Sequence, residues 1–395
     1  MPDPNISTND LAAIFAADTP LIDVRAPVEF IQGSLPGAVN LPILNDEERA
    51  YVGTTYKQNG SEAAVKLGYE LISGAVKQAR LQQWLDFIQQ HPRTVLYCFR
   101  GGQRSRITQQ WLRDAGIDRP LITGGYKLVR QFLINTISYF SEHRKLLVIT
   151  GPTGSGKTRL IHDISNCCPT LDIEAIARHR GSAFGSMSTP QPSQADFENQ
   201  LAVSLLKLEQ HNPSGPVIVE DESRNTGKVY LPVSFFEHMR SAEIIWVDEP
   251  LEARVNNIFE DYILTTSIGH AQQARRAVIP PAPADETGIT YRQALMLFDR
   301  YATALQAISK KLGGDRFQEI LLDLNFARSD FENRNEIQAN KIWIEKLVSY
   351  YYDPLYLGSL QRRQVNPCFK GSRQTVMDYL RTRQNALSRT TGTRY

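Results

Sequence analysis

The eight residues from Gly151 to Thr158 constrain the fold of this chain more than any other stretch. They read Gly-Pro-Thr-Gly-Ser-Gly-Lys-Thr, follow directly on the apolar run Leu146–Thr150, and precede the amphipathic run Arg159–Ile164. A strand, a glycine-rich loop and a helix in this order form a complete Walker A pattern, in which backbone N–H groups close on phosphate oxygens at a helix N-terminus. The lysine adds a positive charge, and the threonine hydroxyl is placed to bind Mg²⁺. The residues predicted to hold phosphate are Gly151, Gly154, Ser155, Gly156, Lys157 and Thr158.

Further apolar runs place this loop in a parallel sheet. Each run is short, and each is separated from the next by a segment long enough for a helix, which is typical of a doubly wound α/β domain. The predicted strands are Leu171–Glu174, Val217–Glu220, Ile244–Asp248 and Glu319–Asp323. We assign residues 136–345 to this P-loop NTPase-like domain and expect its ligands at the carboxyl ends of the strands.

Two groups of polar residues lie near these strand ends. Glu220 and Asp221 are candidates for the acidic Walker B position, and they fit equally well as acids that cap the turn after a strand. The segment Ala177–Gly185 is basic and contains glycine, so it is too polar for the core. We interpret Arg178 and Arg180 as phosphate contacts in a loop over the site.

A second glycine-rich turn surrounds a cysteine. Cys98 follows the strand-like run Thr94–Tyr97 and precedes the helix-like run Ile107–Leu112. The N–H groups of such an arc form a positively polarised nest, which lowers the pKa of a thiol and binds an anion beside it. The alternative, a buried structural cysteine, does not explain two arginines and two glycines in one turn. The residues predicted to form this anion loop are Phe99, Arg100, Gly101, Gly102, Gln103, Arg104 and Ser105.

The surroundings of this cysteine resemble a rhodanese domain. Apolar runs alternate with helical ones through residues 1–135, which predicts a second parallel sheet covered by helices. The fragments that carry the resemblance, in the order of that family, are Asp23–Arg25, Glu29–Phe30, Gly33–Ala38, the Cys98 loop and Gly124–Tyr126. The resemblance implies that Cys98 accepts sulfur or selenium and that the loop amides hold the transferred anion.

The cysteine loop is one residue longer than in sulfur-transferring rhodaneses. Five residues separate Cys98 from Arg104, which is also the spacing found in cysteine-dependent phosphatases. The wider arc suits a tetrahedral, phosphate-sized anion. Hydrolysis of a phosphoester and handling of a phosphorylated chalcogen donor both fit, and the loop alone does not choose between them.

Charge is distributed unevenly along the chain. The 395 residues have a formal net charge of +2, whereas residues 361–395 contain eight Lys or Arg residues and one Asp. A basic tail on an acidic body favours a polyanionic partner. We define residues 346–395 as a helical, basic, Tyr- and Arg-rich C-terminal extension. Its tyrosines either stack on unpaired RNA bases or dock the tail on the second domain.

The cysteines and the hydropathy pattern bear on the compartment. The four cysteines lack the spacing of a disulfide framework or a zinc site, and a reactive thiolate requires a reducing environment, so we expect a cytoplasmic location. We find neither a signal peptide nor an apolar run of membrane-spanning length, which predicts no membrane partner.

Over nearly its whole length the chain resembles the tRNA 2-selenouridine synthases. The most particular pieces are the long Cys98 loop, Gly151–Thr158, Ala177–Gly185 and Val217–Asn225. The resemblance implies exchange of sulfur for selenium at position 2 of the wobble uridine, through S-geranyl-2-thiouridine, with geranyl diphosphate and selenophosphate as co-substrates. It also implies the anticodon region of tRNA as a partner, and an enzyme that produces selenophosphate is a natural second one.

This resemblance gives each predicted site a role. Cys98 becomes the selenium-handling nucleophile, and Arg100, Arg104 and the loop amides hold selenophosphate. Lys157 and Thr158 clamp the pyrophosphate that geranyl transfer expels. Mg²⁺ is compatible with this site, with the Thr158 hydroxyl as one ligand. Two rival functions are a kinase or ATPase fused to a rhodanese sensor, and a cysteine-dependent phosphatase.

Overall fold

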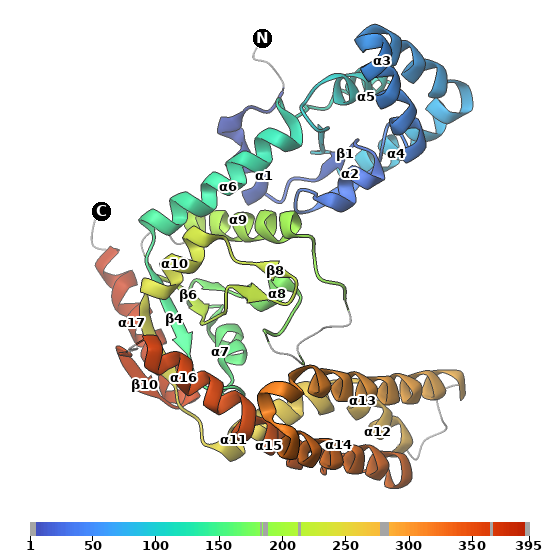
Figure 1. Cartoon of the computed structure of the whole chain (residues 1–395). Helices are drawn as coiled ribbons and strands as arrows, with labels where there is room; N and C mark the ends of the chain where they lie inside the picture. Colours follow the sequence, from blue (N-terminus) through green and yellow to red (C-terminus); the bar gives the residue numbers. More distant parts are fainter. Residues whose placement is uncertain are drawn as a thin grey trace.

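The computed structural model describes residues 5–181, 184, 189–211, 215–276, 284–363 and 366–391. Figure 1 shows two α/β domains joined along the helices α6 and α9, and a helical arm that projects from the second domain. Among the described residues, none of the helices has the length and apolarity needed to cross a bilayer. The predicted fold class, two parallel-sheet α/β domains, is confirmed.

The first domain contains a parallel sheet in the order β2-β1-β3. Its central strand and the strand before Cys98 are fully buried, as expected for a sheet covered on both faces. Isolated parallel bridges join Ile6 to Ile122 and Leu96 to Leu121, which extends the sheet toward α6. The elements are η1 (Thr8–Asp10), α1 (Leu11–Ala16), β1 (Leu21–Asp23), α2 (Pro27–Gln32), β2 (Ala38–Asn40), α3 (Asp46–Leu71), α4 (Gly74–Gln90), β3 (Val95–Tyr97) and α5 (Gln103–Asp114).

The helix α3 is the longest element of this domain that the sequence did not indicate. It begins at Asn45, whose side chain accepts a hydrogen bond from the Glu48 N–H, and it is interrupted at Gly60, where φ is +85°. Its surface is mostly exposed, with Ala64 as its buried residue. A helix with so weak an apolar face gives little periodic signal in the sequence.

The second domain contains a five-stranded parallel sheet in the order β10-β9-β4-β6-β5. The Walker A strand is its central strand, and all five of its residues are buried. The elements are β4 (Leu146–Thr150), α7 (Lys157–Ile164), β5 (Thr170–Leu171), α8 (Ile173–Ala177), α9 (Gln194–His211), β6 (Val217–Glu220), β7 (Asn225–Thr226), β8 (Val229–Tyr230), α10 (Val233–Ser241), β9 (Glu243–Val247), β10 (Phe369–Gly371) and α17 (Arg373–Thr391).

Two predicted strands of this domain are wrong. The run Glu319–Asp323 lies inside a helix, because its apolar residues belong to a longer pattern of buried positions at helical spacing. The strand predicted for Leu171–Glu174 ends after Leu171. The Asp172 side chain accepts a hydrogen bond from the Ala175 N–H and so starts α8.

The described residues between 251 and 363 form a helical arm with its own hydrophobic core, where the sequence had predicted more of the doubly wound domain. Its helices pack against one another below the sheet in Figure 1. They are α11 (Leu251–Phe259), η2 (Glu260–Leu264), α12 (Ser267–Arg276), α13 (Ala284–Leu312), α14 (Gly314–Arg334), α15 (Asn340–Leu347), η3 (Val348–Tyr352) and α16 (Asp353–Arg363).

The C-terminal segment is part of the second domain and does not stand apart as an extension. Phe369–Gly371 pairs in parallel with Ile245–Val247 and forms an edge strand of the sheet. Val376 and Leu380 of α17 are buried against the core that contains α7. The sequence missed this strand because it is three residues long and follows a polar stretch.

The two domains share one hydrophobic core. The helix α6 (Gly125–His143) leaves the first domain and packs on α9, and a single cluster of buried side chains runs from α1 through these helices to the second sheet. At the edge of this contact the Ser34 N–H and hydroxyl both donate to Asp196 Oδ1, at 2.6 and 2.9 Å. The relative position of the domains is therefore fixed by buried apolar surface as well as by polar contacts.

Candidate active sites

Cys98 lies at the carboxyl end of β3, immediately before the arc that leads into α5. Its side chain is 3% exposed, and Sγ lies 3.2 Å from the Ser105 hydroxyl oxygen. The Ser105 hydroxyl also donates to the Gly102 carbonyl at 3.2 Å. Because Ser105 stands at the far end of the arc, the sulfur faces across the turn.

The arc is held in shape by the start of α6. The Tyr126 and Lys127 N–H groups donate to the carbonyls of Cys98 and Phe99, at 2.8 and 3.0 Å. Gly125 allows this approach, because a Cβ on it would lie 2.3 Å from the Cys98 carbonyl oxygen. Gly125 was noticed in the sequence as part of a family pattern. The close approach of the Cys98 carbonyl explains why a glycine is needed there.

Arg104 is held by Glu29 of α2 in a two-point ion pair. Its Nη1 and Nη2 donate to the two carboxylate oxygens at 2.5 and 3.1 Å, and Arg49 Nε lies 3.8 Å from the same carboxylate. Burial opposes ionisation of this group, but the hydrogen bonds and charge of Arg104 outweigh it and hold the pKa of Glu29 below its ordinary value. Glu29 thus fixes the direction of the arginine beside Cys98. In the sequence Glu29 was noticed only as part of the family pattern.

The Walker A loop has the backbone expected of a phosphate site. Gly154 and Gly156 have φ values of +83° and +79°, and a Cβ on Gly151 would lie 2.5 Å from a backbone carbonyl oxygen of β9. Lys157 Nζ donates to the Gly151 carbonyl at 2.9 Å, so its ammonium group lies over the loop. The predicted strand, loop and helix are therefore confirmed as local structure.

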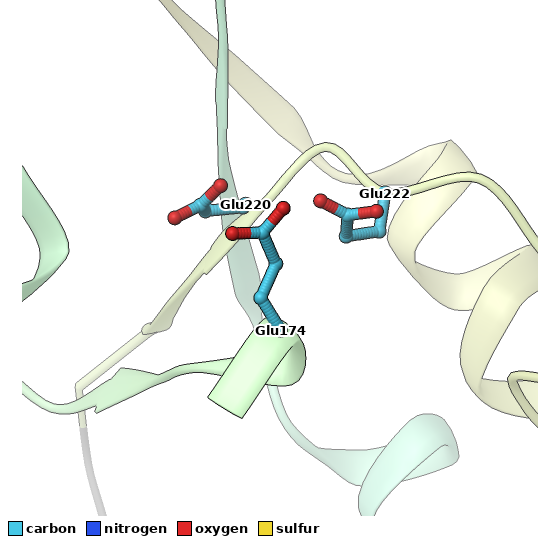
Figure 2. Close-up of side chains that lie close together, drawn as sticks. All are labelled: Glu174, Glu220 and Glu222. Carbon is cyan, nitrogen blue, oxygen red and sulfur yellow. The ribbon is translucent and has the colours of Figure 1, made fainter. Parts of the chain in front are cut away.

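Three glutamates gather beside this loop, as Figure 2 shows. Glu174 of α8, Glu220 at the end of β6 and Glu222 each place a carboxylate oxygen within 4.8 Å of the others. The Thr158 hydroxyl of the Walker A loop donates to Glu174 at 3.3 Å. Glu220 therefore occupies the predicted acidic position, and two further carboxylates join it.

Burial and mutual repulsion perturb these carboxyls. Burial, and then the charges of Glu220 and Glu222, raise the pKa of Glu174 to about 9. Burial and the charge of Glu220 raise the pKa of Glu222 to about 8, and burial raises that of Glu220 as well. Glu220 Oε1 is buried without a hydrogen-bond partner among the described residues. Three close oxygen donors, one of them unsatisfied, fit a hard divalent cation such as Mg²⁺.

Asp221, the second acidic candidate, points elsewhere. Its carboxylate accepts hydrogen bonds from the Thr150 hydroxyl and from Arg363 Nη1, both at 2.7 Å. The Tyr356 hydroxyl lies 2.6 Å from the same Thr150 oxygen, and Tyr351 is buried. The sequence left two explanations for the C-terminal tyrosines, stacking on RNA bases and docking on the second domain. Docking accounts for Tyr351 and Tyr356.

The predicted loop Ala177–Gly185 reaches the glutamates, although residues 182, 183 and 185 lie outside the described part of the chain. A Cβ on Gly181 would lie 2.9 Å from Glu222 Oε2. Arg180 Nη1 donates to the Asp261 carbonyl of the helical arm at 2.7 Å, and Arg178 Nη1 donates to the Pro190 carbonyl at 3.4 Å. Both arginines contact protein here, and their binding of phosphate stays a prediction.

Glu174 and Glu222 are the site residues that sequence reasoning missed. Glu174 was assigned to the interior of a strand, and Glu222 belonged to a stretch noticed for its resemblance alone. For Glu222 the sequence did contain a signal, because Asp221 and Glu222 follow Glu220 directly at the end of a buried strand.

Comparison with known proteins identifies both domains. A family model described as the tRNA 2-selenouridine synthase AAA domain matches residues 144–387, and a model of the rhodanese-like domain matches residues 7–131. The chain belongs to the tRNA 2-selenouridine synthase family. The family domain extends through β10 into α17, in agreement with their place in the second sheet.

Relatives named tRNA 2-selenouridine synthase match the chain from end to end. One from Nitrosomonas europaea is 78% identical and covers 97% of this chain and 100% of its own length. Another from Bdellovibrio bacteriovorus is 54% identical over 93% of this chain and 96% of its own length. One from Cupriavidus pinatubonensis is 41% identical over 95% and 98%. The resemblance noted in the sequence is thereby confirmed.

Proposed function

We propose that this protein replaces sulfur by selenium at position 2 of the wobble 2-thiouridine of tRNA in two steps, each at one of its two anion sites. The observation that supports the proposal is the presence, on one chain of this family, of a buried thiol beside a glycine-rich turn and a complete Walker A loop with a carboxylate cluster. The co-substrates are geranyl diphosphate and selenophosphate, and an enzyme that makes selenophosphate is the expected partner.

In the first step the sulfur of 2-thiouridine attacks C1 of geranyl diphosphate. The new S–C bond forms as the C–O bond breaks, pyrophosphate leaves with the electron pair, and the N3 proton of the base is released to water. Lys157 and the N–H groups of Gly154 to Gly156 stabilise the charge that develops on the pyrophosphate. Glu174, Glu220 and Glu222 would hold Mg²⁺, which neutralises phosphate charge when bound. S-alkylation makes C2 electrophilic and turns the sulfur into a leaving group.

In the second step Cys98 delivers selenium. The selenium of selenophosphate is already fully reduced, so forming a perselenide on the cysteine would require an oxidant, whereas attack of the thiolate on phosphorus does not. An S–P bond forms as the P–Se bond breaks and selenide leaves with the electron pair. Selenide then forms the C2–Se bond as the C2–S bond breaks, and geranyl thiolate departs and takes a proton from water. Water finally cleaves the S–P bond and releases phosphate. This use of the cysteine fits its phosphatase-like loop length and the Arg104 beside it.

Two variants separate the steps. Purified protein is incubated with 2-thiouridine tRNA, geranyl diphosphate and selenophosphate, and the nucleosides are measured by mass spectrometry. We expect Cys98→Ala to accumulate S-geranyl-2-thiouridine, and Lys157→Ala to leave 2-thiouridine unchanged while still converting tRNA that is already geranylated. Full selenation by Cys98→Ala would remove the role given to the thiol. Nucleotide turnover without tRNA would favour the fused kinase or ATPase, and Cys98-dependent cleavage of an aryl phosphate without selenation would favour the phosphatase.

A further inference from the structure

The cavity above Cys98 has two chemically different sides. It encloses about 1130 Å³, and its charged side contains Cys98, Arg100 and Arg104. Pockets for small ligands in proteins span roughly 300–1,000 Å³. The cavity is therefore far larger than a phosphate-sized anion needs, and a second ligand group must account for the remaining space.

The cavity is also lined by apolar residues, which we call the apolar wall: Val52, Ala64 and Val65 of α3, Ile72 at its end, and Ile107 and Trp111 of α5. Ala64, Ile72 and Trp111 are buried, and the other three are half-buried. Tyr69 of α3 lies against Trp111 with ring centroids 6.3 Å apart, so the two helices meet at the back of the cavity, and Figure 1 shows them side by side.

This wall explains the presence of α3. The helix is long, mostly exposed and poor in buried residues, so it adds little to the core of the first domain. Its apolar side chains instead line a cavity that opens beside the Cys98 thiol. Apolar surface left accessible in a cavity marks a site for an apolar ligand group.

We propose that the apolar wall binds the geranyl chain of the S-geranylated wobble base while C2 of that base faces Cys98. This inference rests on the proposed function. In the second step the C2–Se bond forms and the C2–S bond breaks, so the geranyl sulfur must lie next to the selenium donor. A long hydrocarbon chain attached to that sulfur reaches only surfaces in the same cavity, and burying it there removes apolar area from water. The charged side holds selenophosphate, and the wall holds the group that leaves.

The wild-type protein provides the first test. Selenation is measured with tRNAs that carry S-geranyl-, S-dimethylallyl- or S-methyl-2-thiouridine and with selenophosphate, without geranyl diphosphate. We expect kcat/KM to rise with chain length, at least tenfold from methyl to geranyl. Equal values for the three tRNAs would overturn the wall while leaving the proposed function intact. Failure to convert the geranylated tRNA at all would instead refute the proposed function.

Substitutions in α3 test whether the apolar wall causes the preference for geranylated tRNA. Val65→Trp fills the cavity from the wall, and Lys66→Trp places the same side chain on the neighbouring exposed residue, which does not line the cavity. We expect Val65→Trp to lower kcat/KM at least tenfold for geranylated tRNA and less than twofold for methylated tRNA, and Lys66→Trp to change neither. Val52→Trp, from the other end of the wall, repeats the test if Val65→Trp unfolds. Equal losses on both tRNAs, or no loss in either wall variant, would overturn the proposal.

Discussion

The conformation of Gly101 gives the sharpest prediction about the Cys98 arc. Its φ is +61°, and a Cβ there would lie 2.5 Å from the Gly124 nitrogen and 2.7 Å from the Ile122 carbonyl oxygen. An L-residue in the left-handed region costs about 1–2 kcal/mol, and overpacking against a neighbour costs about 1–3 kcal/mol more. Because both contacted atoms are backbone, rotation of a side chain does not relieve them. We therefore expect Gly101→Ala to lower the free energy of unfolding by about 2–5 kcal/mol.

The adjacent glycine is a matched control. Gly102 has a φ of −96°, and a Cβ on it would meet nothing within 4 Å. Gly102→Ala should therefore change the free energy of unfolding by less than about 1 kcal/mol. Urea denaturation of both variants measures the difference, and the rate of alkylation of Cys98 by iodoacetamide reports whether the arc keeps its shape. Equal stability and equal thiol reactivity in the two variants would refute the steric reasoning.

Three further predictions concern charged groups. Glu29→Gln should lower stability at pH 7, and this deficit should shrink as the pH falls below 4.5, because a carboxyl whose pKa is held below its ordinary 4.5 stabilises the fold when ionised and loses that contribution as it is protonated; a deficit that stays constant as the pH falls until the protein unfolds would contradict this. With divalent cations chelated, the wild type should lose stability as the pH rises from about 4.5 to about 8, because over this range the unfolded chain has released the Glu222 proton while the folded protein, in which the pKa of Glu222 is about 8, still holds it. Glu222→Gln should flatten this loss in thermal unfolding, and an unaltered slope would count against it. Arg363→Ala should cost about 3–5 kcal/mol, since it leaves the buried Asp221 carboxylate without its cation, and a melting temperature equal to that of the wild type would refute the estimate.

The sequence predicted both anion loops because each depends on a short, continuous stretch. The backbone of Gly151–Thr158 and the arc after Cys98 are set by glycines and by the strand and helix on either side, all visible within a dozen residues. The same locality explains why the strand that each loop follows was predicted at the correct place.

The carboxylate cluster could not be predicted in this way. Glu174 and Glu220 come together because β5 pairs with β6, and the sequence alone does not show which strands are neighbours. The strand predicted for Glu319–Asp323 was wrong because its local pattern is ambiguous. Five residues of mixed apolar character fit a strand as well as a helix, and only the packing of Phe317, Ile320 and Leu324 in the helical arm decides between them.

The shared core of the two domains restricts how one tRNA uses both sites. The arc of Cys98 is bonded to the start of α6, and α6 packs on α9 in a hydrophobic cluster that continues to the second sheet. Moving the domains apart would expose this cluster to water. In Figure 1 the start of α5 and the start of α7 lie well apart, in different domains. We therefore infer that the geranylated base travels from the Walker A loop to the Cys98 cavity, while the protein keeps its shape. In the proposed sequence of steps, the apolar wall recaptures the alkylated base, because it favours the tRNA that has completed the first step over the one that has not.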